Sequence, residues 1–169
     1  RGPVVGTVMS NLGLEHALRS EGIEFLRAAV GDRYVLELMR KQGGMLGGET
    51  SGHLLCLDRT TTGDGLVSAL QVLAVMKRTG RTLAELAAGM PQFPQVMVNV
   101  RIRERIDPRQ SPAIQEHVRR VEQALGTTGR VVLRASGTEP LIRVMVEGQD
   151  DQVVTRFANE LAETVRRSL

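Results

Sequence analysis

The chain has 169 residues, with 22 Lys or Arg against 19 Asp or Glu, so its formal net charge at pH 7 is +3. Hydrophobic residues make up 41% and charged residues 24%, which is a globular composition and excludes a disordered or collagen-like chain. No apolar run approaches the ~20 residues of a membrane span, and a single cysteine, Cys56, excludes an internal disulfide framework. The length suits one large domain or two small ones.

Hydrophobic patterning in the first half of the chain predicts alternating strands and helices. The predicted strands are residues 3–9, 23–30 and 54–57. The predicted helices are residues 12–19, capped by Ser10 or Asn11, residues 33–42, capped by Asp32, and residues 65–77. Because the last of these helices is apolar nearly all round, we expect it to be buried against a sheet. This order predicts an α/β fold, a mixed βαβ domain with some parallel pairing.

Gly89, Pro91 and Pro94 interrupt the pattern after a short helix, so we expect two domains, residues 1–89 and 90–169. The second domain follows the order β-α-β-β-α. Its predicted elements are strand 95–102, helix 114–125, strands 130–135 and 141–147, and helix 153–165. Both helices are apolar on one side only, which predicts a small α+β domain with helices on one face of an antiparallel sheet.

The turn between the last two predicted strands concentrates groups that bind anions. Ser136 and Thr138 offer hydroxyl donors, and Gly137 lets backbone N–H groups approach a ligand closely. Arg134 and Arg143 lie at the two ends of the hairpin, where they can converge on one phosphate through charge-assisted hydrogen bonds. A plain hairpin turn is the alternative, because Ser, Gly, Thr and Pro are common turn residues.

The glycine-rich segment 47–53 carries a second polar group. Glu49 is an acceptor at both oxygens when ionised, which suits the neighbouring hydroxyls of a sugar, and Ser51 can donate or accept on the same rim. His53 can contact a ligand, brace the loop or bind a metal, and the metal is disfavoured because no second His or Cys stands at ligand spacing. A glycine-rich hairpin with a solvated Glu49 is the alternative.

These two loops, in this order, resemble the C-terminal part of the α-D-phosphohexomutase superfamily. Residues 47–53 are similar to the family's sugar-binding loop, and residues 134–140 with Arg143 are similar to its phosphate-binding loop. Residues 30–35 and 61–65 further resemble members that act on glucosamine phosphates. The resemblance covers almost the whole chain, and it implies most of the family's third domain followed by its fourth.

The resemblance implies a cytoplasmic isomerase that interconverts glucosamine 6-phosphate and glucosamine 1-phosphate and feeds UDP-N-acetylglucosamine and cell-wall synthesis. In the family a phosphoserine gives its phosphoryl group to the sugar, and the resulting sugar 1,6-bisphosphate returns the other phosphate to the serine. Mg²⁺ neutralises charge on the transferring group. The partner implied is therefore a small-molecule sugar phosphate, and members acting on mannose or glucose phosphates are the near alternative.

The resemblance also assigns roles to individual residues. The sugar-binding residues that it implies are Glu49, Ser51 and His53, and the phosphate-binding residues are Arg134, Ser136, Gly137, Thr138 and Arg143. The chain departs from the family pattern at Ala135, where the family usually has proline, and at Ala29, where some relatives have lysine. Because a basic contact is lost at Ala29, the nearby Arg33 is a candidate to contact the substrate phosphate in its place.

The phosphoserine and Mg²⁺ loops of the superfamily belong to its first two domains. This sequence has no resemblance to a serine nucleophile loop with an adjacent histidine, and it has no Asp-x-Asp-x-Asp cluster for a hard cation. We therefore expect no catalytic residue and no metal ligand in this chain. The phosphoserine and the Mg²⁺ site are expected in an N-terminal part that is absent here, and the chain alone is expected to lack mutase activity.

A nucleic-acid-binding module is the alternative from a different class. It is motivated by the arginine content, because all of the 22 basic residues except Lys41 and Lys77 are arginines. Aromatic residues make up just 2% of the chain, however, which leaves little for base stacking, and a charge of +3 is modest for a phosphate-backbone binder. A non-catalytic sugar-phosphate-binding protein is a further alternative. We expect neither a nucleic acid nor a membrane partner, and the sequence does not indicate an oligomeric state.

Overall fold

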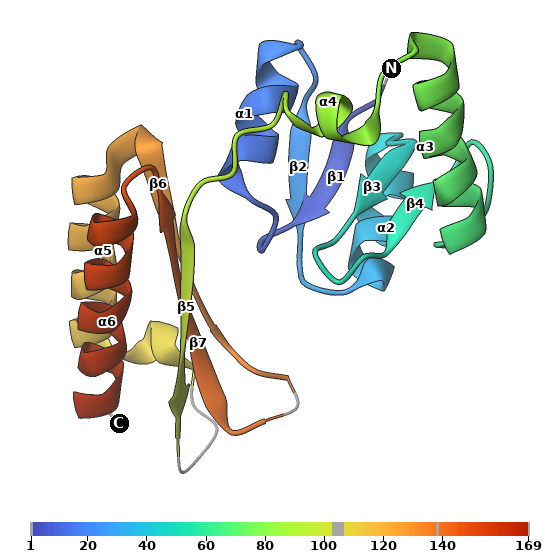
Figure 1. Ribbon diagram of the computed structural model, residues 1–169. Helices are drawn as coiled ribbons and strands as arrows, with labels where there is room; N and C mark the ends of the chain where they lie inside the picture. Colours follow the sequence, from blue (N-terminus) through green and yellow to red (C-terminus); the bar gives the residue numbers. More distant parts are fainter. Residues whose placement is uncertain (1, 103–106, 138, 169) are drawn as a thin grey trace. The chain divides into compact units, whose positions relative to one another are not determined.

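The computed structural model describes residues 2–102, 107–137 and 139–168 (Figure 1). The chain forms two compact units, Arg1–Gln92 and Phe93–Leu169. The first is a mixed α/β unit and the second an α+β unit, so the predicted fold class is confirmed.

A four-stranded sheet is the centre of the first unit. Its strands lie in the order β2 (Phe25–Ala28), β1 (Val4–Thr7), β3 (Leu46–Gly48) and β4 (Leu54–Cys56). Strand β1 pairs in parallel with β2 on one side and β3 on the other, and β4 runs antiparallel to β3. The strand that follows β1 in the chain, β2, thus lies on one side of β1, and the next strand, β3, lies on the other side. The carboxyl ends of β1 and β3 form a topological switch point, the position where open α/β sheets bind ligands.

Four helices accompany this sheet: α1 (Leu12–Ser20), α2 (Asp32–Gln42), α3 (Gly65–Thr79) and α4 (Leu83–Ala87). The side chain of Asn11 caps α1 by accepting from the Gly13 N–H. Asp32 is not the cap of α2, and that prediction is wrong by one residue. Gly31 is the cap, at a φ of 128° that side-chain-bearing residues rarely adopt, and Asp32 occupies the first turn, where its charge suits the helix dipole.

The hydrophobic core of the first unit lies between the sheet and α2. Val5 of β1, Leu55 of β4 and Val35 and Met39 of α2 are almost completely buried there. Gly47 of β3 allows this close packing, because a Cβ at that position would lie 2.5 Å from the sulfur of Met39. The predicted sugar-binding segment 47–53 therefore begins within a tightly packed strand.

Helix α3 is not buried as its sequence pattern predicts. Leu66, Leu70 and Leu73 are 80%, 61% and 56% exposed, and Ser68 is the one buried residue of the helix. The reason is topological, since α3 follows the edge strand β4 and meets it only along one side. On that side the Ser68 hydroxyl lies 3.5 Å from the carbonyl oxygen of Leu54.

The second unit is a three-stranded antiparallel sheet with β7 (Leu141–Gly148) between β5 (Gln95–Arg101) and β6 (Gly129–Ala135). Helices α5 (Pro112–Leu125) and α6 (Asp151–Arg167) lie on the same face of this sheet, as predicted (Figure 1). Two short 3-10 helices, η1 (Pro108–Gln110) and η2 (Gly126–Thr128), flank α5.

Alternation along β7 divides its side chains between two faces. Ile142, Val144 and Val146 have no exposed area and pack against the helices, together with residues of α6 such as Leu161. Their neighbours in sequence, Arg143 among them, point to the face that α5 and α6 leave uncovered. This face carries the arginine pair described below. No helix within the described residues is long and apolar enough to cross a membrane.

Candidate functional site

Polar loops follow the carboxyl ends of β1, β2 and β3 at the switch point of the first sheet. The loop after β3 contains the predicted residues Glu49, Ser51 and His53, and the loop after β2 contains Gly31 and leads to Arg33. The Gly31 N–H donates to Glu49 Oε2 at 3.0 Å, which joins these two loops. Segments 18 residues apart in sequence therefore share one edge of the sheet, and the structure brings the three predicted sugar-loop residues together there.

The Glu49 carboxylate organises its own loop. Its Oε1 accepts from the Ser51 hydroxyl at 2.7 Å, and the Ser51 Oγ lies 2.8 Å from His53 Nδ1. The Glu49 N–H donates to the His53 carbonyl oxygen, and the Gly52 N–H donates to that of Glu49. With 8% of its side chain exposed, Glu49 is more enclosed than a solvated loop carboxylate. The exposed members of this group are Ser51 and His53.

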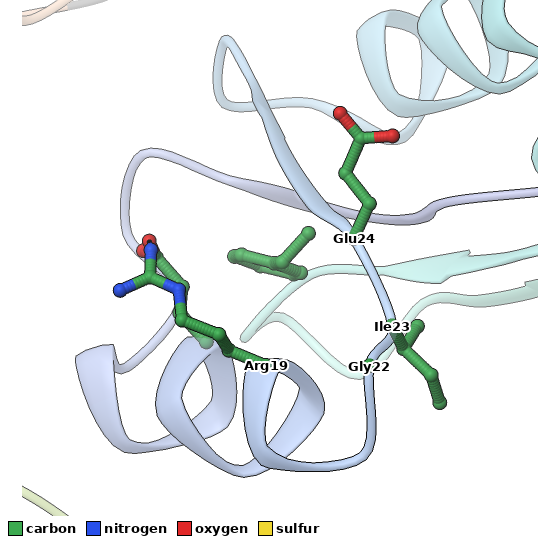
Figure 2. Close-up of a pocket in the computed structure, with 6 residues that line it drawn as sticks. Arg19, Gly22, Ile23 and Glu24 are labelled. Carbon is green, nitrogen blue, oxygen red and sulfur yellow. Dashed lines mark hydrogen bonds and ion pairs between the residues drawn. The ribbon is translucent and has the colours of Figure 1, made fainter.

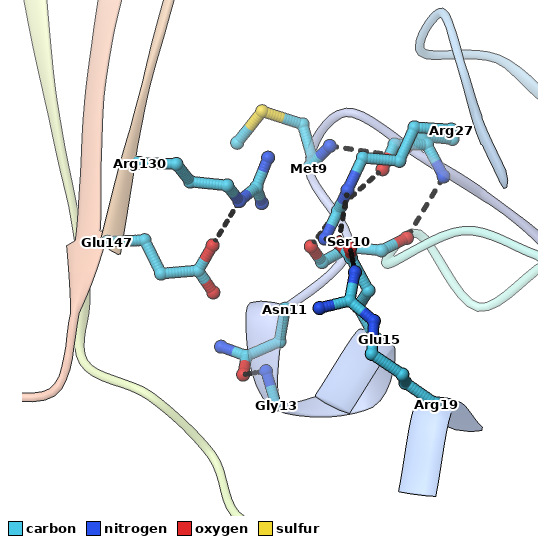
Figure 3. Close-up of polar contacts among 10 residues, drawn as sticks. Met9, Ser10, Asn11, Gly13, Glu15, Arg19, Arg27, Arg130 and Glu147 are labelled. Atoms are coloured by element: carbon cyan, nitrogen blue, oxygen red, sulfur yellow. Dashed lines mark hydrogen bonds and ion pairs between the residues drawn. The ribbon is translucent and has the colours of Figure 1, made fainter. Parts of the chain in front are cut away.

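The loop after β1 is held by Arg27 of β2 (Figure 3). One nitrogen of the guanidinium, Nη1, donates to the carbonyl oxygens of Thr7 at 3.0 Å and Ser10 at 2.6 Å, and Nη2 pairs with Glu15 at 3.0 Å. The Arg27 side chain is 18% exposed, and a guanidinium in this setting makes strong charge-assisted bonds. Arg27 is therefore a structural support of the edge on which the site lies.

Arg33 lies at the start of α2, two residues beyond the Gly31–Glu49 contact. Its Nε donates to Glu37 at 2.8 Å, and the hydrogen bond to this carboxylate raises the pKa of Arg33. The side chain is 80% exposed. Exposure leaves the other guanidinium nitrogens available to a ligand, while the pair with Glu37 is weak enough to be exchanged for a phosphate.

A hollow of about 400 Å³ lies beside the sugar-loop residues. It is lined by His53 and Leu54, by Gly63, Asp64 and Gly65 before α3, and by residues of α3. Asp64 accepts from the Leu66 and Val67 N–H groups with one carboxylate oxygen and thus caps the helix. The lining combines an imidazole and a carboxylate with small residues, which suits a small polar ligand.

A second hollow, of about 480 Å³, lies between the end of α1 and the start of β2 (Figure 2). It is lined by Glu15, Arg19, Gly22, Ile23, Glu24 and Phe25. Figure 2 shows the Arg19 and Glu24 side chains directed apart rather than toward a common point. Because the hollow is at the amino end of β2, it lies at the edge opposite the switch point, and it contains none of the predicted residues.

In the second unit, Arg134 and Arg143 stand directly opposite each other on β6 and β7. The Nε atoms of both are buried without a hydrogen-bond partner in the described part of the chain. Burial lowers the pKa of Arg134, and the charge of Arg143 lowers it further. The carboxylate of Glu139 lies 3.8 Å from Arg143 Nη2. This geometry leaves two adjacent positive charges that an anion would compensate.

The turn that joins the two arginine-bearing strands is closed by Ser136. Its N–H donates to the Leu141 carbonyl oxygen at 2.8 Å, and its hydroxyl accepts from the Glu139 N–H at 3.3 Å. No described residue accepts the hydroxyl hydrogen of Ser136. Gly137 follows in the exposed part of the turn, and the predicted residue Thr138 lies outside the described residues.

Asn99 is a further candidate site residue that the sequence pattern does not single out. It is paired with Arg143 in the β5–β7 register, so its exposed side chain shares a face with the two arginines. The resulting row, Asn99–Arg143–Arg134, offers amide and guanidinium donors on the face without helices. The available sequence signal is the strict alternation within 95–101, which places Asn99 on the side away from the core valines.

The donor set does not fit a metal ion. Within residues 2–102, 107–137 and 139–168, no group of three or more His, Cys, Asp or Glu side chains is placed to hold one. The polar groups that the structure gathers are instead hydrogen-bond donors and a hydroxyl–imidazole–carboxylate chain. These groups suit phosphate and hydroxyl ligands.

Comparisons with known proteins match the two units of the chain separately. Residues 1–93 match the family model described as phosphoglucomutase/phosphomannomutase, alpha/beta/alpha domain III, and residues 97–164 match the model of the C-terminal domain of the same family. The chain thus has the architecture of the C-terminal pair of domains of a known class: an α/β unit with a polar loop at its switch point, followed by an α+β unit with a partly buried arginine pair. The chain belongs to the phosphoglucomutase/phosphomannomutase family.

Among curated proteins the chain is similar to bacterial phosphoglucosamine mutases. It is 60% identical over 168 residues to that of Methylococcus capsulatus and 58% identical over 167 residues to that of Alkalilimnicola ehrlichii, with 99% of this chain covered in both cases. The chain spans only 38% and 37% of the length of these two relatives.

Solved structures show the same fold at low sequence identity. The N-acetylphosphoglucosamine mutase of Aspergillus fumigatus, in complex with GlcNAc-6P and magnesium, is 19% identical with a TM-score of 0.81, covering 96% of this chain and 41% of that one. A phosphoglucomutase/phosphomannomutase family protein of Burkholderia thailandensis is also 19% identical, with a TM-score of 0.72, covering 99% of this chain and 38% of that one.

Proposed function

We propose that this chain is the sugar- and phosphate-binding part of a phosphoglucosamine mutase, which interconverts glucosamine 6-phosphate and glucosamine 1-phosphate in the cytoplasm. The observation that carries the proposal is the arginine pair, because two opposed guanidinium groups with buried, unbonded Nε atoms call for an anion. The 60% identity to a phosphoglucosamine mutase supports glucosamine as the sugar.

The reaction explains why the chain carries two polar sites. During turnover through a sugar 1,6-bisphosphate, the sugar presents first one phosphate and then the other for transfer. In this proposal Arg134, Arg143, Ser136 and Gly137 hold the phosphate that is not reacting, together with Thr138, whose role rests on the resemblance alone. Glu49 orders the sugar loop, and Ser51 and His53 stand on its exposed rim, where they meet the sugar hydroxyls.

Binding in this form contributes to catalysis by positioning. Phosphoryl transfer depends mainly on holding the donor, the acceptor and the developing charge in line, and a firmly held remote phosphate supplies part of that orientation. The exposed Arg33 adds a basic group at the switch-point edge, and we propose that it contacts the substrate phosphate. We expect Arg33→Ala to weaken sugar phosphate binding, whereas an unchanged affinity would remove Arg33 from the site.

The transferring chemistry itself is not assigned to this chain. Its described residues do not fit Mg²⁺, and we propose that the phosphoserine and the metal belong to the part of the longer relatives that this chain does not span. The chain alone is accordingly expected to have no mutase activity. Turnover of glucosamine 6-phosphate by the purified chain would contradict this part of the proposal.

The proposal is tested by titrating the isotope-labelled chain with glucosamine 6-phosphate and following backbone amide chemical shifts. We expect shifts in residues 47–53 and in the Ser136–Gly137 turn. Glucose 6-phosphate and mannose 6-phosphate serve as comparisons for the near alternatives, and random-sequence DNA serves for the nucleic-acid alternative. The proposal fails if glucosamine 6-phosphate at millimolar concentration moves neither loop, or if DNA moves the arginine pair and sugar phosphates do not.

A further inference from the structure

The carboxylate of Glu139 lies beside the arginine pair of the second unit. Its Oε2 atom is 3.8 Å from Arg143 Nη2, a separation that gives electrostatic attraction without a hydrogen bond. The Glu139 side chain is 60% exposed, and that of Arg143 is 31% exposed. Glu139 is thus a weak, solvated counter-ion for a guanidinium group whose Nε is buried without a partner in the described part of the chain.

The backbone of the turn fixes the position from which this carboxylate reaches the arginine pair. The Glu139 N–H donates to the Ser136 hydroxyl oxygen at 3.3 Å, and the Glu139 carbonyl oxygen accepts from the Leu141 N–H at 2.9 Å. The second of these bonds closes a three-residue turn around Pro140, whose restricted φ suits such a turn. Both contacts use main-chain atoms of Glu139, so a change in its side chain leaves them in place.

The effect of the carboxylate reverses when a phosphate binds. Without a ligand, the negative charge of Glu139 partly compensates the two opposed guanidinium groups. A phosphate monoester carries a charge of about −1.5 to −2 at pH 7. When such a group binds between the arginines, Glu139 is a like charge beside it and a competitor for Arg143. The side chain that stabilises the free arginine pair therefore opposes the bound phosphate.

We infer that Glu139 is an internal counter-ion that a substrate phosphate displaces from Arg143, and that this competition limits how tightly the arginine pair holds phosphate. The arginine pair as the phosphate site rests on the proposed function. In that function the sugar bisphosphate leaves the pair and returns with its other phosphate. Equally tight binding of every bound state lowers KM without raising kcat, so a carboxylate that shortens the residence of phosphate favours turnover.

Titration of the whole chain with inorganic phosphate at constant ionic strength, followed by the amide resonances of residues 136 and 137, tests this competition. We expect Glu139→Gln, which keeps the size of the side chain, to lower the dissociation constant about two- to fivefold, the range of an exposed ion pair. Glu139→Asp keeps the charge and should keep the weaker binding. Glu163→Gln is the matched control, because it removes the same charge from an exposed pair with Arg166 and Arg167 on α6 and should leave the dissociation constant unchanged.

Displacement is observed at the Arg143 Nε–H resonance in the same samples. We expect this resonance to differ between the unsubstituted chain and Glu139→Gln without phosphate, and the difference to be largely lost at saturating phosphate. A difference that persists at saturation means that the carboxylate stays paired, and it overturns the displacement. Equal or weaker phosphate binding by Glu139→Gln overturns the inference and leaves the proposed function in place. If none of these proteins binds phosphate, the arginine pair is not an anion site, and the proposed function fails together with the inference.

Discussion

Arg134 and Arg143 face each other across β6 and β7, and within the described residues no group fully compensates the two charges. Like charges directly opposite on neighbouring strands destabilise a sheet by a few tenths to about 1 kcal/mol. The carboxylate of Glu139 is 3.8 Å from Arg143 and 60% exposed, so it screens the pair weakly. An anion bound between the guanidinium groups therefore stabilises the folded state.

Inorganic phosphate is expected to raise the free energy of unfolding of the chain. At about 100 times the dissociation constant the gain is about 2.7 kcal/mol, because the ligand binds only the folded state. In Arg134→Met most of this gain disappears, while the stability without phosphate is equal to or above that of the unsubstituted protein. Urea unfolding with phosphate, and with sodium chloride at matched ionic strength, measures both quantities. An equal phosphate gain in the variant would show that the anion binds elsewhere.

Glu49→Gln is expected to destabilise the first unit by about 1–3 kcal/mol, because both carboxylate oxygens accept hydrogen bonds and an amide offers only one acceptor. Faster hydrogen exchange at the Gly31 amide should accompany the loss. Glu37→Gln is the matched control, since its carboxylate forms an exposed pair with Arg33 and should contribute less than about 0.5 kcal/mol. Equal losses in the two variants would contradict the role given to Glu49.

Acidification is expected to destabilise the second unit through His117. Burial lowers the pKa of His117, the charge of Arg120 lowers it further, and Glu160 opposes the shift. Below the ordinary value of about 6.5 the unfolded chain therefore binds more protons than the folded chain. The free energy of unfolding then decreases as the pH is lowered. Above that value this contribution is absent.

Thermal unfolding between about pH 7.5 and pH 5 measures this dependence for the protein and for His117→Gln. We expect a shallower fall in melting temperature for the variant over this interval. The other two histidines are unchanged, so the difference between the profiles reports on His117. Parallel profiles would exclude it as a source of the dependence.

The second unit follows closely from its sequence. The core valines of β5 alternate strictly, α6 is apolar on one side, and a five-residue loop between β6 and β7 is typical of a hairpin. Because a hairpin pairs residues symmetrically about its turn, the spacing of Arg134 and Arg143 already predicts that they are close. Asn99 is different, since the register of β5 against β7 depends on tertiary pairing over 40 or so residues of chain.

The contacts of Glu49 are also outside the reach of pattern reasoning. Its residue type predicts an acceptor, but its partner Gly31 is fixed by the parallel order β2-β1-β3 and by the positive φ that makes Gly31 the cap of α2. Hydrophobic periodicity indicates which face of a helix is apolar, but it does not indicate which other element packs against that face. For this reason the pattern of α3 predicts burial, while the leucines of this edge helix stay exposed.

Two substitutions test that exposure directly. Leu70→Gln on α3 is expected to change the free energy of unfolding by no more than about 0.5 kcal/mol, because 61% of Leu70 is already in contact with water. Met39→Ala on α2 is expected to cost about 2–5 kcal/mol, because Met39 has no exposed area and its removal leaves a cavity between helix and sheet. Urea unfolding of both variants measures the contrast. A loss above about 2 kcal/mol for Leu70→Gln would mean that α3 is packed on its leucine side, and it would restore the burial that the sequence pattern predicts.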